Sequence, residues 1–594
     1  MLFRSQAASA NRESVFSKLL PSNLPKPLQS LLLRTTGLGQ ASEAYRAVAS
    51  QDNSKPIAQR LIEYLNVSIQ VSDVDLMRIP RKGPTLVVAN HPCGILEGAV
   101  LATVLQRLRP DVRFLTNALL GSIPEIRDLV IPVDVLSTSA AGVANSSGLR
   151  RALEHLVADG MLVIFPAGEV SHFQWKRRGI ADPVWSPTVA RLLRCAAKLG
   201  HEPVVTPIYA SGSNSLLFHL GGMIHPRIRT ALLPRELINK QGATVELRIG
   251  AGVDFDKLRN LPSDTECIEY LRWRTDILEQ RTPFKARTSL ALNRVKTKPQ
   301  AEIIDAEHAE MLATEVSALE PLTASGDLAV YLTQAFRIPH TLREISRLRE
   351  ITFRAAGEGT GLGADLDKFD KHYLHLFVWN TAKQEVVGAY RLSPTNGGPA
   401  SLYTHKLFRF DQSFLDAMGP ALELGRSFIR AEYQKGFAPL LLLWKGIGKF
   451  LAQNPQYKIL FGPVSISNQY ESLSRELMIA FLERTASLPE WMNLVNARRS
   501  PSRGKTDMRC ESVEELSSVV SGLEPNAAGI PVLLRQYLRL GGKLVNFNVD
   551  PEFSNALDGL IVVDLTKTEP SLLDRYLGKQ EAQSFLAFHQ HRSE

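Results

Sequence analysis

Short apolar runs separated by helix-length stretches are the feature that most limits how this 594-residue chain can fold. In the first half most of these runs end in Asn, Pro or Gly, and they occupy 85–90, 112–117, 161–168, 204–211 and 244–253. They lack apolar–polar alternation, which is typical of strands covered on both faces. Helical patterns at 97–108 and 146–158 lie between them. The first half therefore predicts an α/β layered domain.

The second half has a different order of helical and strand patterns. Helical patterns occupy 341–355 and 439–453, and the strand patterns occupy 375–380, 385–393, 421–429 and 458–466. The short gap between the first two strands is typical of a hairpin, so a mostly antiparallel central sheet is predicted. Further on, 529–551 predicts a helix leading into a strand, and 558–565 another strand. We expect this last part to complete the sheet of the second domain or to close over a substrate tunnel in it.

A reversal of charge marks the junction between the halves. Residues 285–298 carry five cations and no acid, whereas 302–320 carry six acids, with Pro299 between. The predicted organisation is a basic amphipathic N-terminal segment at 1–60, one domain at 61–285, a linker at 286–320 and a second domain at 321–594.

Composition excludes several classes of protein. The chain is 44% apolar and 22% charged, which is typical of folded rather than disordered chains. No run of about 18 apolar residues predicts a spanning helix. The four cysteines form no CxxC pair, and the N-terminus shows no apolar signal core, so a reduced cytoplasmic compartment is expected.

The net charge of +9, from 69 Lys and Arg against 60 Asp and Glu, suits an anionic partner or simple solubility. No nucleic-acid-binding motif occurs, so nucleic acid is not expected. The first 35 residues hold five cations and one acid, Glu13, interleaved with apolar residues. Such a segment suits a lipid interface, although a flexible, partly helical tail is the alternative.

A histidine at the end of an apolar run is the first candidate catalytic residue. The sequence NHPCG (90–94) follows the strand at 85–90, and Glu97 comes six residues after His91. The carboxyl ends of strands face the usual ligand crevice of an α/β domain. A carboxylate beside the imidazole fixes its tautomer and leaves one nitrogen basic. A structural histidine is the alternative interpretation.

A second apolar run ends in the sequence FPAGE (165–169). The cations Lys176, Arg177 and Arg178 follow it, and they suit a phosphate or carboxylate, or else form a solvated loop.

Together these blocks resemble the glycerolipid acyltransferase family over roughly 65–255. Its NH-x4-D, FPEG and strand-Pro blocks correspond here to Asn90-His91 with Glu97, to FPAGE and to VVTP (204–207). The acid lies one residue later than in the family, and the Glu of FPEG is displaced to Glu169. The resemblance implies that His91 is the general base for attack of a hydroxyl on an acyl thioester and that Glu97 orients it. The implied substrate-binding residues are Phe165, Pro166, Gly168 and Glu169.

Charged residues in and around the strands are the candidates in the second half. Asp367 and Asp370 lie three apart, so they could share one cationic partner such as a substrate amine, or form a solvated loop. Glu423 and Arg426 lie inside an apolar strand, where charge is costly unless it is paired. Strand alternation places these two side chains on opposite faces.

These residues resemble the acyl-homoserine-lactone synthase branch of the N-acyltransferase (GNAT) superfamily. The ordered elements that carry the resemblance are Arg349, Phe353, Asp367-x-x-Asp370, Gly388-x-x-Arg391 and Glu423-x-x-Arg426. Ornithine-lipid N-acyltransferases and their hemolysin-like relatives are nearer, over about 340–485. The resemblance implies that the two aspartates orient an amine, that Glu423 accepts its proton, and that Arg391 and Arg426 bind carboxylate or pantetheine groups. Arg349 and Phe353 belong to the same implied substrate site.

The two resemblances together imply an α/β, two-domain, bifunctional aminolipid synthase of the ornithine-lipid type. The second domain would N-acylate an amino acid such as ornithine with a 3-hydroxyacyl group, and the first would O-acylate the resulting lyso-lipid. The stretch 432–438 is poor in Gly for a pyrophosphate loop, which favours acyl carrier protein over coenzyme A as donor. We expect no metal, no tightly bound cofactor, and a peripheral location on the cytoplasmic face of the inner membrane.

Three alternatives remain open. The chain could be a lysophospholipid acyltransferase with a regulatory second domain. It could be a hemolysin-like membrane effector with decayed sites, although the candidate residues are all present. A Cys-His hydrolase that uses Cys93 beside His91 is the third.

Overall fold

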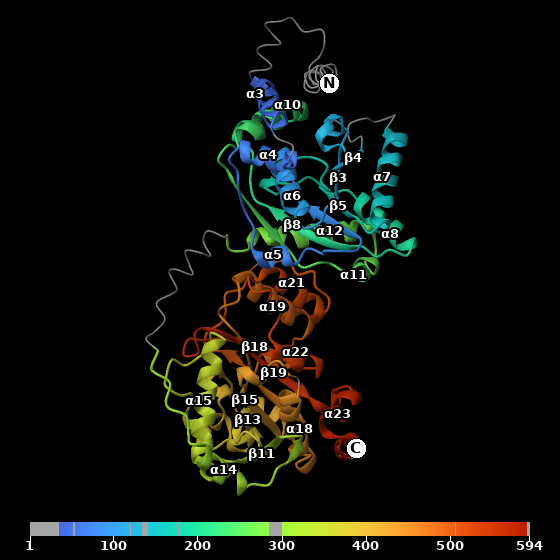
Figure 1. Cartoon of the computed structure of the whole chain (residues 1–594). Helices are drawn as coiled ribbons and strands as arrows, with labels where there is room; N and C mark the ends of the chain where they lie inside the picture. The colour runs from blue at the N-terminus through green and yellow to red at the C-terminus, as the bar shows by residue number, and fades with distance from the viewer. Residues whose placement is uncertain are drawn as a thin grey trace, which may run out of the picture. The chain divides into compact units, whose positions relative to one another are not determined.

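A computed structural model describes residues 35–51, 54–118, 120–133, 141–175, 177–283, 300–436, 438–504 and 506–590. The chain divides into two compact units, Met1–Leu292 with Ser521–Ala528 and Asn293–Val520 with Gly529–Glu594 (Figure 1). The predicted N-terminal segment and linker fall partly outside the described residues, at 1–34 and 284–299.

The first unit contains a seven-stranded sheet in the order β1-β9-β8-β2-β5-β3-β4 (Figure 1). Its strands are β1 (Ser68–Gln70), β2 (Thr85–Ala89), β3 (Val112–Asn117), β4 (Val130–Val133), β5 (Met161–Ile164), β8 (Val204–Ala210) and β9 (Thr244–Ile249). All neighbours are parallel except β8 and β9. The expected α/β layered domain is confirmed.

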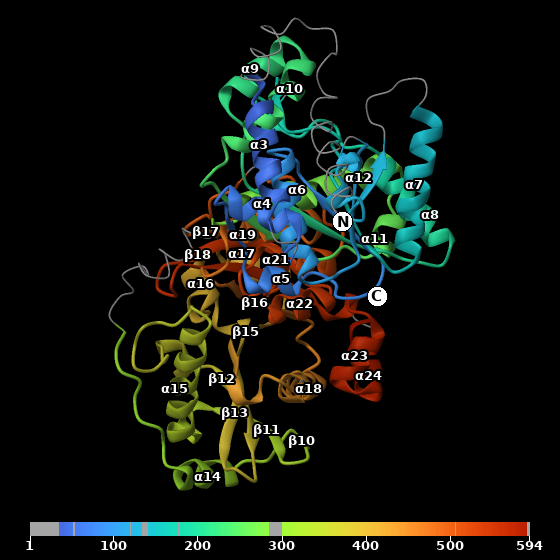
Figure 2. The same cartoon turned by 45° about the horizontal axis from the view of Figure 1, so that its top comes forward.

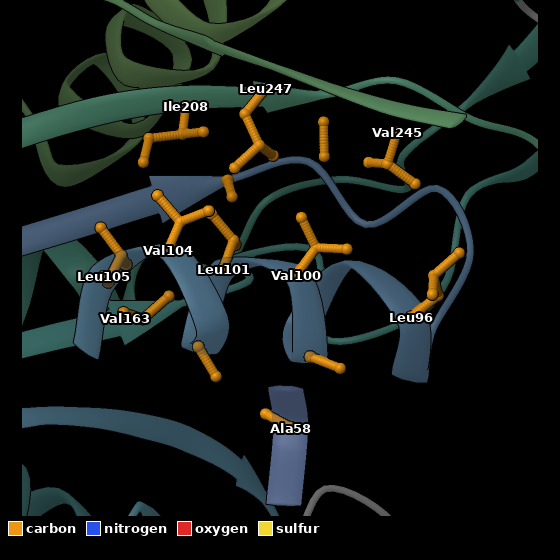
Figure 3. Close-up of a cluster of buried hydrophobic side chains, with 14 of the residues drawn as sticks. Ala58, Leu96, Val100, Leu101, Val104, Leu105, Val163, Ile208, Val245 and Leu247 are labelled. Carbon is orange, nitrogen blue, oxygen red and sulfur yellow. The ribbon is translucent and has the colours of Figure 1, made fainter. Parts of the chain in front are cut away.

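Burial explains why the central strands do not alternate. Every residue of β2 and β5 is buried, so both faces of these strands need apolar side chains. Helix α6 (Ile95–Gln106) packs its Val100 and Leu101 against the sheet, together with Ile208 and Leu247 (Figure 3). This core fixes the end of β2 and the start of α6, the two elements that flank the NHPCG block.

Further helices surround this sheet. They are α3 (Leu38–Ala49), α4 (Ile57–Tyr64), α5 (Asp73–Met77), α7 (Ala141–Val157), α8 (Thr188–Lys198), α9 (Leu216–Ile224), α10 (Pro226–Ile238), α11 (Phe255–Arg259) and α12 (Asp264–Asp276). The helix expected at 97–108 begins two residues earlier, because Glu97 caps the first turn rather than opening it.

The second unit contains an eight-stranded sheet in the order β10-β11-β12-β13-β15-β16-β19-β18. The strands are β10 (Thr323–Ser325), β11 (Leu328–Gln334), β12 (Leu374–Asn380), β13 (Glu385–Pro394), β15 (Ala421–Ile429), β16 (Ile459–Ile466), β18 (Lys543–Asp550) and β19 (Ala556–Asp564). All neighbours are antiparallel except β15 and β16. The mostly antiparallel sheet is confirmed, and β18 and β19 complete it as expected.

Two helices cover opposite faces of this sheet (Figure 2). Helix α15 (Pro339–Ala355) packs with Tyr331 and Phe377, whereas Gly446 of α18 (Ala438–Gln453) lies against Val330 and Leu376. Consecutive strand residues therefore face different helices, as the pleat requires. The remaining long helices of this unit are α14 (Ala309–Ser317), α19 (Ser472–Thr485), α21 (Val513–Leu523), α22 (Val532–Arg539), α23 (Pro570–Leu577) and α24 (Lys579–Gln590).

The one parallel pair of the second sheet is incomplete. β15 and β16 pair only from Ala421 with Ile459 to Glu423 with Phe461, although both strands continue beyond. Separately, among the described residues of both units no helix has the length and apolar character needed to cross a bilayer.

Candidate active sites

The side chain of Asn90 fixes the end of β2 by forming two hydrogen bonds with the backbone of β8. The Asn90 amide donates to the carbonyl of Ala210 at 2.9 Å and accepts from its N–H at 2.7 Å. This paired contact joins β2 to β8 one residue beyond the regular ladder. His91 therefore leaves the carboxyl edge of the sheet, with β5 on one side of β2 and β8 on the other.

His91 and Glu97 form the pair that the sequence predicted. His91 Nδ1 lies 2.7 Å from Glu97 Oε1, and the Glu97 side chain is 1% exposed. The same oxygen accepts the N–H groups of Cys93 at 3.0 Å and Gly94 at 2.8 Å. The Glu97 side chain is thus fixed at the start of α6. With Nδ1 facing it, Nε2 is the ring nitrogen left to accept a proton.

A left-handed glycine lies in the turn between His91 and Glu97. Gly94 has φ +97°, a left-handed conformation that glycine adopts at little cost, and it directly precedes α6. From the third position of the helix, the Glu97 carboxylate reaches back over this turn.

The imidazole and the backbone of His91 have further supports. The ring stacks on Phe165, with centroids 4.3 Å apart. The backbone N–H of His91 donates to Asp182 Oδ1 at 3.1 Å, and its backbone carbonyl accepts the Ser171 N–H at 2.7 Å. Trp185 Nε1 holds the other Asp182 oxygen at 3.0 Å. Asp182 was not predicted from the sequence, because the stretch DPVW (182–185) matches no motif.

The FPAGE block supports the site from several directions. Phe165 covers the His91 ring, the carbonyl of Pro166 accepts Ser186 N–H at 2.8 Å, and Gly168 turns the chain at φ +66°. The Glu169 carboxylate pairs with Arg229 of α10. Phe165 is the member of this block that the structure brings onto the imidazole.

Two other sequence candidates have clear places. Arg177 lies 3.4 Å from Asp276, so it has a partner within the chain, and Lys176 lies outside the described residues. Cys93 is buried, and burial with the Glu97 charge raises the pKa of its thiol to about 12. A thiolate nucleophile is therefore disfavoured at Cys93.

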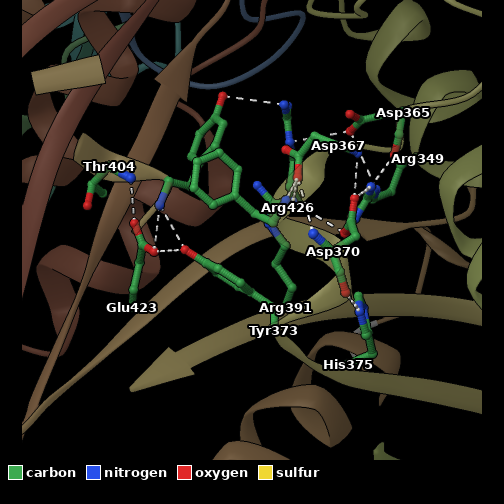
Figure 4. Close-up of polar contacts among 12 residues, drawn as sticks. Arg349, Asp365, Asp367, Asp370, Tyr373, His375, Arg391, Thr404, Glu423 and Arg426 are labelled. Atoms are coloured by element: carbon green, nitrogen blue, oxygen red, sulfur yellow. Dashed lines mark hydrogen bonds and ion pairs between the residues drawn. The ribbon is translucent and has the colours of Figure 1, made fainter. Parts of the chain in front are cut away.

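In the second unit, Arg349 and Asp370 form a buried bidentate pair. Two nitrogens of the Arg349 guanidinium lie 2.8 and 2.9 Å from the two Asp370 oxygens, and its Nε lies 3.4 Å from Asp365 Oδ2 (Figure 4). Burial alone would raise the pKa of Asp370, but Arg349 and Arg391 outweigh it and hold this pKa far below its usual range. Asp370 is therefore ionised.

The shared cation of Asp367 and Asp370 is a residue of the chain, so the proposed partnership with a substrate amine is corrected. An Arg391 nitrogen donates to Asp367 Oδ1 at 2.8 Å and to Asp370 Oδ1 at 3.2 Å. The Arg391 side chain is 1% exposed. Its Nε and other terminal nitrogen have no hydrogen-bond partner among the described residues. These N–H groups remain available to an anionic ligand.

Arg426 lies with the other cations, contrary to the alternation that placed it opposite Glu423. Its φ is +51°, and β13 carries a bulge opposite this part of β15. Its guanidinium lies 4.9 Å from the Tyr403 ring centroid, the same distance as the Arg391 guanidinium. The left-handed residue breaks the period of two, so both arginines flank Tyr403.

Glu423 is enclosed and has several donors. It accepts the Tyr373 hydroxyl and the backbone N–H groups of Tyr403 at 3.1 Å and Thr404 at 2.6 Å (Figure 4). Burial raises its pKa. A carboxyl group held by three donors positions the 403–404 backbone, rather than standing free to accept a substrate proton.

Several members of this cluster were not predicted from the sequence. Tyr403 touches both arginines, Asp365 contacts Arg349 and Arg426, and His375 bonds the carbonyl of Asp370 at 2.8 Å. Burial lowers the pKa of His375 to about 4. Tyr403 lies outside every motif, whereas Asp365 stands two residues before the Asp367 pair, where a third acid was a visible signal.

Family models match both units. A model described as "Acyltransferase" matches residues 62–283, and one described as "Acetyltransferase (GNAT) domain" matches residues 348–445. The chain thus combines an N-terminal acyltransferase domain with a C-terminal GNAT domain, which confirms the predicted two-domain α/β fold class. The prediction of an acyltransferase enzyme is confirmed at the level of these domains.

Curated relatives carry two kinds of name. A "Glycine N(alpha)-acyltransferase" of Bacteroides thetaiotaomicron is 37% identical over 201 residues, 31% of this chain and 60% of the relative. A "Lyso-glycine lipid O-acyltransferase" of the same organism is 27% identical over 222 residues, 36% of this chain and 75% of the relative. The chain spans about 60% of the length of the first relatives it matches.

Among solved structures, the 1-acyl-sn-glycerophosphate (LPA) acyltransferase PlsC from Thermotoga maritima matches at 17% identity and a TM-score of 0.23. This match covers 45% of this chain and 92% of that one.

Proposed function

We propose that the chain makes an acylated amino-acid lipid by two successive acyl transfers. The GNAT domain joins a 3-hydroxyacyl group to the α-amine of an amino acid, and the acyltransferase domain then acylates the hydroxyl of that lyso-lipid. The observation that carries the proposal is one chain with a His91–Glu97 pair in one unit and a buried Arg391–Tyr403–Arg426 cluster in the other. The printed names of the curated relatives, one an N-acyltransferase and one a lyso-lipid O-acyltransferase, support the order.

In the O-acylation, His91 Nε2 takes the proton of the hydroxyl as its oxygen attacks the thioester carbonyl. Glu97, facing Nδ1, stabilises the imidazolium that forms. The thiolate of the donor then leaves, so no covalent enzyme intermediate is required. The contact with Phe165 holds the ring in the position that this attack needs.

In the N-acylation, the unpartnered N–H groups of Arg391 suit the carboxylate of the amino acid. The backbone groups of β15 and β16 beyond Glu423 and Phe461, where the two strands no longer pair, suit the amides of a phosphopantetheine arm. An acyl carrier protein remains our proposed donor. The amino acid is proposed to be ornithine or glycine, ornithine from the sequence resemblance and glycine from the names of the relatives.

The substrate and product of the second step are lipids, so we propose that the chain works at the cytoplasmic membrane surface. Helix α9 supports this proposal. Its exposed side chains are Leu216, Leu217, Leu220, Met223 and Ile224. The stretch 216–240 holds four cations and one acid, which suits an anionic bilayer. Helix α10, which follows α9, reaches the FPAGE block through Arg229.

Expression in a bacterial host that lacks aminolipids tests the function. Lipid extracts analysed by mass spectrometry, with labelled ornithine and labelled glycine supplied in separate cultures, should contain a new diacylated amino-acid lipid that carries one of the labels. Extracts without any acylated amino acid would contradict the proposal. Extracts with new O-acylated phospholipid alone would instead favour a lysophospholipid acyltransferase with a regulatory second domain.

A further inference from the structure

Three buried carboxylates gather on one face of β19 and its neighbours. Asp558 stands opposite Ser465 of β16 and Asn548 of β18 in the sheet register. Ser465 Oγ donates to Glu358 Oε2 at 2.7 Å. Asp550 lies two residues beyond Asn548 and so faces the same side of β18. We call Glu358, Asp550 and Asp558 the acid trio.

Charge around the acid trio is not balanced. Arg426 is the cation that acts on both Glu358 and Asp558, and it also lies 3.4 Å from Asp365. The Arg349 and Arg391 guanidinium groups already contact the Asp365, Asp367 and Asp370 group. One guanidinium is therefore shared by Glu358, Asp558 and Asp365, so a further cation beside the acid trio would be attracted.

Asp558 is the member of the acid trio without a hydrogen-bond donor. Glu358 has Ser465, and Asp550 accepts Glu552 N–H at 2.9 Å. Asp558 is 4% exposed, and its Oδ2 has no hydrogen-bond partner among the described residues. Leaving a buried acceptor unsatisfied costs about 1–3 kcal/mol, so a donor from a ligand would relieve it.

The missing donor has the chemistry of an amine. No group of three or more His, Cys, Asp or Glu side chains in the described parts of the chain is arranged to hold a metal ion. Tyr403 connects the acid trio with the carboxylate-binding groups. Burial, together with the charges of Asp550 and Asp558, raises the pKa of its hydroxyl, and its ring lies against Arg391. An amino acid has a carboxylate and an amine at a short, fixed separation.

We propose that Asp558, assisted by Glu358 and Asp550, receives the amino group of the amino-acid substrate and accepts a proton from it. This inference rests on the proposed N-acylation. The substrate nitrogen loses two protons between ammonium and amide: Asp558 accepts one and passes it to water, and the departing thiolate takes the other. The C–N bond forms as the C–S bond breaks. Burial and the neighbouring carboxylates raise the pKa of Asp558 well above its usual value, which makes its carboxylate a stronger base.

The test is Asp558→Asn, with Asp416→Asn at an exposed position of the same domain as the control. N-acylation by the full chain should fall about 100-fold or more in kcat/KM for the amino acid, while the KM for the acyl donor stays unchanged. The Tm should stay level or rise, because the change removes a buried, repelled charge. The Asp416→Asn variant should match the wild type in both measurements.

Three results would overturn the inference. Unchanged N-acylation in Asp558→Asn would show that Asp558 takes no part, and a clearly lowered Tm would show that it is a satisfied structural group. Calorimetric titration of the wild type with glycine and with ornithine separates this inference from the proposed function. An amino acid that binds the wild type and not Asp558→Asn supports the acid trio even if no acyl transfer occurs. Equal binding by both proteins rejects it.

Discussion

His91 Nδ1 lies 2.7 Å from Glu97 Oε1, and that oxygen also accepts two backbone N–H groups at the start of α6. The carboxylate is therefore fixed by the helix terminus before it orients the imidazole. This relationship makes Glu97, the partner of His91, part of the N-terminal cap of α6.

His91→Ala should abolish O-acylation, with a loss of about 10²–10⁴-fold, because no other group accepts the hydroxyl proton. The GNAT domain does not contain His91, so N-acylation should persist and the monoacyl amino acid should accumulate in lipid extracts. A folded variant that forms no acylated amino acid at all would show that the division of labour between the units is wrong.

Glu97→Gln should lower the kcat of O-acylation about 100-fold or more with little change in KM. The amide cannot stabilise the imidazolium, and its NH2 group can face Nδ1 and favour the wrong tautomer. An unchanged kcat would indicate that Glu97 acts only as the helix cap.

Glu423→Ala should cost about 2–5 kcal/mol of folding stability, because it leaves the buried N–H groups of Tyr403 and Thr404 without an acceptor. Thermal unfolding of the wild type, of Glu423→Ala and of Glu423→Gln, each as the full chain, provides the measurement. Glu423→Gln keeps one acceptor oxygen and should retain more stability and more N-acylation. O-acylation in both variants should remain near wild type; if O-acylation is lost instead, the two sites are not independent.

The neutral His375 predicts acid sensitivity of the second unit. Its pKa is about 4 in the folded chain and about 6.5 when unfolded, so the unfolded state binds the extra proton first as the pH falls. Stability should thus decline between pH 6.5 and 4, by about 3 kcal/mol in total. His375→Gln should flatten this part of the plot of Tm against pH. Parallel slopes for the two proteins would contradict the assignment.

Leu220→Ser with Ile224→Ser should weaken binding to phosphatidylglycerol vesicles at least tenfold, because each side chain loses about 1.5–3 kcal/mol of apolar burial. Vesicle sedimentation measures this. The control is Met77→Ser with Val184→Ser, which changes two apolar residues of the same unit outside α9 that are 76% and 87% exposed. Equal losses in both double variants would remove the special role of α9.

The linear pattern was sufficient for much of the fold. Apolar runs without alternation predicted β2 and β5 as strands covered on both faces, and the spacing of 375–380 and 385–393 predicted the β12–β13 hairpin. Local periodicity determines these features, because each depends on which side chains a short segment must bury. The domain models matched to the two halves agree with the predicted fold class.

Only the tertiary structure showed which charged residues pair with one another. Asp367 and Asp370 were expected to hold an external amine, but the fold brings Arg391 to them from another strand. Arg426 was placed by strand alternation on the wrong face, since a single left-handed residue resets the direction of the side chain.

The sequence by itself therefore determined the two α/β units and the His91–Glu97 candidate. Only the tertiary structure decided that Glu423 is enclosed by three donors and that Asp558 lies buried without one. The physical reason is that charge compensation acts through space over a few ångströms. Glu358, Arg426 and Asp558 are far apart along the chain, and no local sequence pattern indicates that the fold brings them together.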